Sequence, residues 1–132
     1  MKKRISILIS LLAILSLCLS GCAKYTSHYS ATAHVHSNEP DTAFMSFWQF
    51  EGNMVFQLKC KEAGQSLAYT AKLGTGSATV YYDCGDGKTE LCAVSAGEET
   101  QSVLEGLKPG TVYVIVEADG RCENGDFHFD IQ

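Results

Sequence analysis

Hydrophobic and polar residues alternate along most of the chain after residue 41, with the period of two that is typical of half-buried β-strands. The strongest run is Thr111 to Ala118, in which three valines alternate with Tyr113 and Ile115. Similar runs are separated by turn residues, including the Asp-Gly pairs at 86–87 and 119–120. No segment after residue 41 has the period of an amphipathic helix. The pattern therefore predicts an all-β, antiparallel β-sandwich of about seven or eight strands, with a barrel as the alternative.

The first 21 residues follow a different pattern. Three basic residues, Lys2 to Arg4, precede an apolar stretch from Ile5 to Leu19. As a helix this stretch would be roughly 22 Å long, whereas the hydrocarbon core of a bilayer is about 30 Å thick. A basic head followed by a short apolar helix is typical of a secretory signal peptide. Residues 1–21 are therefore predicted to be a signal that is removed on export.

The signal ends in Leu19-Ser20-Gly21-Cys22, which resembles the lipobox of bacterial lipoproteins. The resemblance implies cleavage before Cys22, a diacylglycerol on its thiol and a further acyl chain such as palmitate on its new amino group. Several acyl chains hold a protein to a bilayer far more tightly than one chain does. The expected location is a cell membrane or an outer membrane, with the protein facing outside the cytoplasm.

Residues 23–40 are small and polar and contain few core-forming side chains. This composition predicts a flexible tether that lifts the domain off the membrane, although its β-branched residues would also let part of it pair with a sheet edge. The predicted organisation is a signal peptide at 1–21, a lipidated tether at 22–40 and a sandwich domain at 41–132.

Charge argues against one class of partner. The signal contains three of the ten basic residues, so the rest of the chain has seven basic residues against fifteen acidic ones, a net charge of −8 with histidine neutral. Nucleic acids require a basic surface, and a polybasic contact with anionic lipids does as well. Neither partner is expected, and the membrane contact is assigned to the lipid alone.

Four cysteines remain after Cys18 and Cys22 are set aside. An even number of cysteines in a small exported domain favours disulfides. Four cysteines allow three pairings. The preferred one joins Cys84 to Cys92 across a hairpin and Cys60 to Cys122 between the first long strand and the last. Free buried thiols are the alternative.

Two tyrosines are candidates for contact with a ligand. Tyr81 and Tyr113 lie opposite the apparent core faces of their strands. Aromatic rings on an outer sheet face stack on the apolar faces of sugar rings, and they also serve to cover a sheet. Trp48 lies in the apolar run Met45-Ser46-Phe47-Trp48 and is expected to belong to the core.

Two groups of residues are weak candidates for a metal site. His34 and His36 flank one residue, so on a strand both rings would point the same way, and His28 or His128 would complete a site for zinc or copper. Solvated histidines are the alternative. Asp83, Asp86 and Glu90 surround the Asp-Gly turn and would offer oxygens to calcium, although their spacing departs from the EF-hand template.

The stretch from Leu107 to Val116, which closes on residues 125–129, resembles the C-terminal half of bacterial pre-peptidase C-terminal domains and similar jelly-roll modules. It also resembles the tyrosine-corner strand of fibronectin type III domains. Both resemblances imply a β-sandwich, jelly-roll-like in the first case. The first also implies a non-catalytic appendage of an exported protein that takes part in binding. Neither resemblance carries over a functional residue.

The sequence contains no nucleophile elbow, zinc-protease motif or phosphate-binding loop, so neither an enzyme activity nor a cofactor is expected. The leading hypothesis is a membrane-anchored lipoprotein that acts as a binding or adhesion module for a glycan, a cell-wall polymer or a protein. One alternative is an accessory or structural subunit of an envelope complex with no ligand of its own. Another is a metal-handling lipoprotein that uses His34 and His36.

Overall fold

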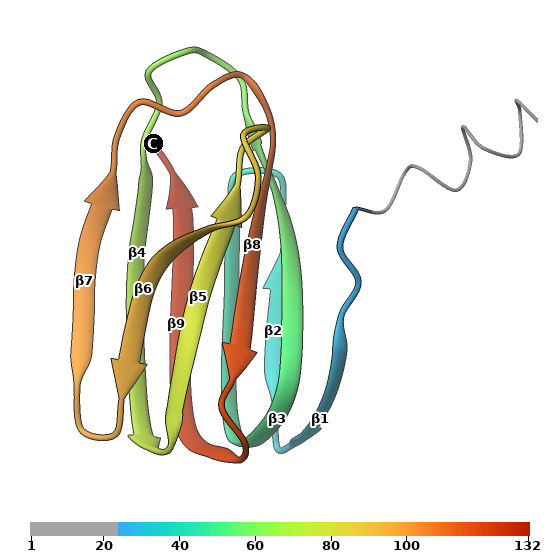
Figure 1. The fold of residues 1–132 in the computed structure, drawn as a ribbon, viewed down its shortest axis with the longest axis vertical. Coiled ribbons are helices and arrows are strands. Elements are labelled where there is room, and N and C mark those ends of the chain that lie inside the picture. The colour runs from blue at the N-terminus through green and yellow to red at the C-terminus, as the bar shows by residue number, and fades with distance from the viewer. Residues whose placement is uncertain (1–23) are drawn as a thin grey trace, which may run out of the picture.

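The computed structural model describes residues 24–132, so the predicted signal peptide and Cys22 lie outside the described residues. Residues 24–132 form nine antiparallel strands and no helix (Figure 1). The strands are β1 (His28–Thr32), β2 (Val35–Asn38), β3 (Thr42–Cys60), β4 (Leu67–Thr75), β5 (Ser77–Asp83), β6 (Thr89–Ser95), β7 (Glu99–Leu104), β8 (Gly110–Ala118) and β9 (Cys122–Ile131). The all-β prediction is confirmed. Within this part of the chain, no helix is long and apolar enough to cross a membrane.

The strands form two layers that share β3. The order of hydrogen-bonded neighbours is β6-β5-β8-β3-β9-β4-β7. Residues 53–60 of β3 pair with β8, which places them in a layer with β5 and β6. Residues 42–50 of β3 pair with β9, which places them in a second layer with β4 and β7. The predicted β-sandwich is thus confirmed.

The sandwich is one antiparallel sheet folded in half. β4 pairs with β9, and β5, which follows after a single residue, pairs with β8. β8 and β9 likewise continue one another along β3, and β6 and β7 continue one another along β5 and β4. In Figure 1 the bend of β3 and the connections β4–β5, β6–β7 and β8–β9 all lie at the same end of the molecule, which we call the fold line. A glycine with positive φ lies at each turn: Gly52, Gly76, Gly97 and Gly120.

Gly52 shows why the fold line requires glycine. Its φ is +97°, which side chains with a Cβ rarely adopt. A Cβ at this position would also overlap the carbonyl oxygen of His28 on β1. The sequence predicts a turn at 51–53, and the structure has a sharp bend at this point inside the continuous strand β3.

The core lies between the layers and follows the predicted alternation. Met54, Phe56 and Leu58 of β3 are buried, as are the alternate residues of β4, β8 and β9. Trp48 differs from the prediction, because its side chain is 52% exposed. Phe47 and Phe50 both enter the core although they are three residues apart. The regular alternation of buried and exposed residues is therefore interrupted between them, and Trp48, which follows Phe47, lies on the outside.

The segment expected to be a tether is mostly part of the sheet. β1 and β2 pair with β3 in one register, from His28 opposite Asn53 to Asn38 opposite Ala43, with a break at Ala33, whose φ is +48°. Asn38 also exchanges two hydrogen bonds with the backbone of Gln57 in the other half of β3, at 2.7 and 2.8 Å. This segment therefore closes the open side of the sandwich. The prediction of a flexible tether is wrong for these residues, and the alternative of edge pairing is confirmed.

The two preferred disulfides are not formed, and all four cysteines of the described chain are free thiols. Cys60 pairs with Gly110 at one end of β3, whereas Cys122 pairs with Phe50 beside the fold line. Cys92 lies opposite Val80 on β5, and Cys84 follows the end of β5 at Asp83. A disulfide needs Cα atoms about 4.4–6.8 Å apart. The strand register therefore excludes Cys60–Cys122, and Cys84 and Cys92 are free.

Candidate functional site

The outer face of the layer that contains β9, β4 and β7 carries the best candidate site. The core-facing residues of these strands are Phe127 and Phe129 on β9 and Leu67, Tyr69 and Ala71 on β4. The residues between them point outward and lie beside one another by register. We call this surface the groove face; it comprises Phe44, Ser46 and Trp48 of β3, Asp126, His128 and Asp130 of β9, Ala68, Thr70 and Lys72 of β4, and Gln101 and Val103 of β7.

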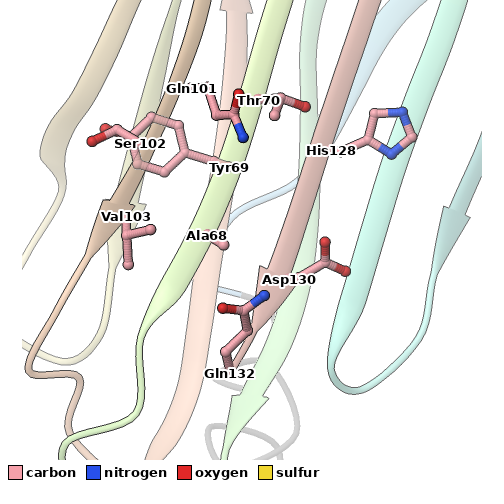
Figure 2. A pocket seen from close by; sticks show the side chains of 9 residues that line it. All are labelled: Ala68, Tyr69, Thr70, Gln101, Ser102, Val103, His128, Asp130 and Gln132. Carbon is pink, nitrogen blue, oxygen red and sulfur yellow. The ribbon is translucent and has the colours of Figure 1, made fainter.

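A groove of about 400 Å³ crosses β9, β4 and β7 on this face. Figure 2 shows Thr70, Gln101 and His128 along one side of it and Asp130 and Gln132 toward one end. Hydroxyl, amide and carboxylate groups therefore line the groove together. They offer hydrogen-bond donors and acceptors within one site. The apolar floor comes from Ala68 and Val103, which face each other across β4 and β7.

Aromatic rings extend the groove face toward β3. Phe44 stacks on His128, with ring centroids 5.6 Å apart and planes inclined by 20°. Trp48 lies four residues further along β3, about 13 Å from Phe44 at the usual rise of a strand. Its large exposed ring has no partner ring within the described residues. The face thus combines a polar groove with a separate, open aromatic surface.

The groove face carries two carboxylates, Asp126 and Asp130, and one lysine, Lys72. His128 Nε2 lies 2.8 Å from Asp126 Oδ1. Lys72 lies opposite Asp126 on one side and Glu99 on the other. Asp130 accepts a hydrogen bond from the hydroxyl of Thr42. The site therefore contains no cluster of cations that would favour a strongly anionic ligand.

The predicted tyrosines lie on the opposite side of the sandwich. Tyr81 and Tyr113 share the outer face of β5, β8 and the second half of β3, since Tyr81 pairs with Ile115 and Asp83 with Tyr113. We call this surface the tyrosine face. Lys88 Nζ lies 4.3 Å from the ring centroid of Tyr81, and Tyr25 packs edge-on against Tyr113 at 5.2 Å. Both rings are half-buried, because side chains of the same chain cover them.

Asp83 is a buried carboxylate beneath these side chains, with 1% of its surface exposed. Oδ1 accepts hydrogen bonds from the backbone N–H groups of Gly85 (2.8 Å) and Gly87 (3.2 Å). Oδ2 accepts one from the Tyr25 hydroxyl (2.7 Å) and lies 2.8 Å from Lys24 Nζ. The Lys24 ammonium, together with these donors, holds the pKa of Asp83 well below its usual range despite burial.

The predicted calcium site is not assembled. Asp83 directs both oxygens at donors of its own chain, and Asp86 pairs with Lys108 Nζ at 2.7 Å. The histidine prediction is correct in part, since the rings of His34 and His36 lie parallel with centroids 5.4 Å apart. Within residues 24–132, however, no three histidine, cysteine or acidic side chains converge as a metal site would require.

The exposure of Trp48 was the main feature missed from the sequence. The signal was present, because Met45 and Phe47 share one face of a strand and Trp48 must then lie on the other, with Phe44 and Ser46. The convergence of β9, β4 and β7 into a groove had no comparable signal, since it depends on the order in which distant strands pair.

Comparisons with known proteins find structures with a similar fold but no related sequence. No protein-family model matches the sequence, and no curated protein matches it. The resemblance of residues 107–129 to pre-peptidase C-terminal domains therefore stays a prediction.

Several solved structures are similar in outline. A family 61 carbohydrate-binding module in complex with β-1,4-galactotriose is 14% identical over 77% of this chain and 81% of its own, with a TM-score of 0.44. A family 29 carbohydrate-binding module is 14% identical over 80% and 75%, with a TM-score of 0.40. A family 29 variant complexed with mannohexaose is 16% identical over 80% and 78%, with a TM-score of 0.37. At these TM-scores the likeness assigns neither a ligand nor a binding residue to this chain.

Proposed function

We propose that the protein is a lipid-anchored, non-catalytic module that binds a neutral carbohydrate polymer outside the cytoplasm through its groove face. The exposure of Trp48 carries the proposal. Tryptophan is highly buried on average in folded proteins, so a ring that is half in solvent is unusual, and tryptophan is enriched with tyrosine and arginine at binding hot spots. Trp48 lies on the same face as the groove, which gives one surface both kinds of contact that a sugar chain needs.

The chemistry of the face suits sugars. A sugar ring has an apolar face, which stacks on an aromatic ring, and an edge of hydroxyls, each both donor and acceptor. Trp48 supplies the ring. Thr70 of β4, Gln101 of β7 and Gln132, which follows β9, supply matching polar groups in the groove, beyond Phe44 and His128 as seen from Trp48. The distance from Trp48 to the groove favours an extended chain over a single sugar.

The acidic side chains favour a neutral polymer. Asp126 and Asp130 lie in or beside the groove, and Lys72, the lysine of this face, lies between Asp126 and Glu99. A polymer of uronic acids or teichoic phosphates would bring further negative charge to this surface, at a cost that rises at low salt.

The same carboxylates do not form a glycosidase centre. Asp126 and Asp130 are four residues apart on one strand, about 13 Å, whereas hydrolysis of a glycosidic bond uses two carboxyl groups about 5–9.5 Å apart. The geometry therefore supports binding without cleavage.

Fluorescence tests the proposal directly, because Trp48 is the only tryptophan in the sequence. The purified protein would be titrated with neutral and with acidic polysaccharides. We expect a blue shift with a neutral polymer, since stacking removes the indole from water, and no shift with an acidic one. Binding without a change in Trp48 emission would place the site elsewhere. No binding to any polymer would favour the accessory-subunit hypothesis.

A further inference from the structure

We propose that the tyrosine face is the surface of the domain that lies against the membrane, and that the groove face consequently points away from it. The inference rests on the proposed lipid anchor at Cys22. It adds an orientation and a lipid contact to the proposed function, and it assigns a role to side chains that the groove does not use.

Contacts of the first described residues carry the argument. Lys24 and Tyr25 both reach Asp83 Oδ2, at 2.8 and 2.7 Å. Tyr25 also packs on Tyr113, and Ser27 accepts a hydrogen bond from the backbone of Val55 at 2.8 Å. The start of the described chain is therefore fixed to the tyrosine face at several points. We call the contacts of Lys24 and Tyr25 with Asp83 the latch.

The chain outside the structure is too short to carry the lipid far from this point. Only Ala23 separates Lys24 from Cys22. Two residues span at most about 7 Å when fully extended. An acylated Cys22 must lie at the membrane surface, so the membrane lies within a few ångströms of the latch. This is the opposite of a domain lifted off the bilayer by a long tether.

The composition of the face suits a bilayer surface. Tyrosine is enriched at membrane–water interfaces, where its ring contacts the apolar region and its hydroxyl stays wet. Tyr25, Tyr81 and Tyr113 gather here. Lys24 lies near the ring of Tyr25 and Lys88 over the ring of Tyr81, and Lys108 pairs with Asp86 in the turn after β5. Long lysine side chains extend charge toward water while their stems cover apolar surface.

Three of the acidic groups near these lysines are paired, and Glu90, which lies opposite Tyr81, is offset by the exposed Lys59 on the outer side of β3, so the face does not repel a membrane strongly. Lys24 pairs with Asp83, Lys88 with Glu117 and Lys108 with Asp86. The face is therefore close to neutral, and the contact is expected on uncharged phosphatidylcholine bilayers as well as on anionic ones. Ile115 is only 2% exposed although it lies on this outer face, which shows how closely the side chains cover it.

The orientation follows from the two layers. In Figure 1 β5 and β6, in the layer of the tyrosine face, pass in front of β4 and β9, in the layer of the groove face, so the two outer faces point in opposite directions. Packed sheets are about 10 Å apart, and side chains project from both outer faces. A membrane on the tyrosine face therefore leaves the groove face open to a polymer.

The single tryptophan again provides the test. The protein would be produced with its own signal, its acylation would be checked by mass spectrometry, and it would be placed in phosphatidylcholine vesicles with brominated acyl chains, which quench indole on contact. Trp48 of the natural protein should not be quenched. In a Trp48→Phe background, the Tyr81→Trp variant should be quenched, and a thermal melt would confirm that it folds. Quenching of Trp48, or its absence in a folded Tyr81→Trp variant, would overturn the proposal.

Trypsin gives a second test that does not depend on a new tryptophan. Cleavage after Lys24 would release the domain from vesicles, but the latch holds this side chain against Asp83. We expect slow release of the natural protein and release about ten times faster for Tyr25→Phe, which removes one hydrogen bond to a charged group. Equal rates would refute the latch. An unacylated Cys22 would refute the membrane contact as a whole, while glycan binding by the groove face would remain measurable.

Discussion

The ring of Phe47 lies directly over Gly125 on the neighbouring strand β9, so closely that a Cβ at Gly125 would overlap the ring. This contact fixes the side of β3 on which each aromatic residue lies. Phe47 fills the space above the glycine and enters the core beside Phe50, at a centroid distance of 5.1 Å. Trp48, the next residue, is thereby directed outward onto the groove face.

Gly125→Ala should destabilise the protein by about 1–3 kcal/mol, since the added methyl overpacks the core at Phe47. For a domain of this size that corresponds to a fall in Tm of roughly 4–20 °C. A double variant that also carries Phe47→Leu should recover part of the loss, because leucine leaves room for the methyl group. Thermal melts of the three proteins test this. An unchanged Tm for Gly125→Ala would mean that Phe47 does not occupy this space.

The fold line predicts a contrast between two glycines with positive φ. Gly52 lies where a Cβ would meet the backbone of His28, whereas Gly64 has open space around it, with φ values of +97° and +88°. Gly64→Ala should cost about 1–2 kcal/mol from backbone strain alone. Gly52→Ala should cost more, because the carbonyl of His28 must also move. Urea denaturation of both variants measures the difference, and equal losses would contradict the steric role of Gly52.

Asp83 predicts how stability depends on pH. Its pKa is lowered in the folded state, chiefly by Lys24, so its contribution is fully present above the ordinary carboxyl pKa of about 4. Below that pH the unfolded chain takes up a proton that the folded protein does not, and stability falls. The Asp83→Asn variant should be less stable than the natural protein by about 1.5–3 kcal/mol at pH 7 and lose less on acidification. Denaturation curves of both proteins at pH 7 and pH 3 test both points. An equal fall in the free energy of unfolding from pH 7 to pH 3 in the two proteins would contradict this role of Asp83.

The cysteines provide a test of the strand register. Because all four thiols of the described chain are free, a reducing agent should leave the Tm unchanged, and a denatured sample should show four thiols besides any at Cys22. Burial raises the pKa of Cys92 to about 11, so its alkylation in the folded protein should be slow at pH 8 and should accelerate up to that pH. A thiol count of two or none would show that disulfides form.

Alternation alone was sufficient to identify the core-facing side of several strands. In β8 the valines at 112, 114 and 116 are buried, and Tyr113 on the opposite side is half-buried, as the sequence predicts. The same holds for β4 and for the second half of β3. These runs were predictable because each strand has one face on the core. Hydrophobic and polar residues therefore alternate along it, and consecutive residues show which side is buried.

Features that depend on distant strands were not predictable. Whether Cys60 can reach Cys122 depends on register across the whole of β3, which spacing along the chain does not contain. Edge pairing of residues 28–38 was one of two alternatives, but that the edge belongs to β3 depends on strands far apart in the sequence. The sequence placed Tyr81 and Tyr113 opposite the core faces of their own strands, but only the structure shows that they share one outer face and that Lys88 and Tyr25 cover them.

The central claim is that the groove face binds a neutral polysaccharide through Trp48. Affinity electrophoresis of the natural protein and the Trp48→Ala variant in gels that contain the polymer identified by fluorescence tests it most directly, with Tyr81→Phe as a matched control on the other face. We predict binding at least about tenfold weaker for Trp48→Ala, as expected for a central aromatic contact, and unchanged binding for Tyr81→Phe. Equal retardation of the natural protein and a folded Trp48→Ala variant would contradict the account.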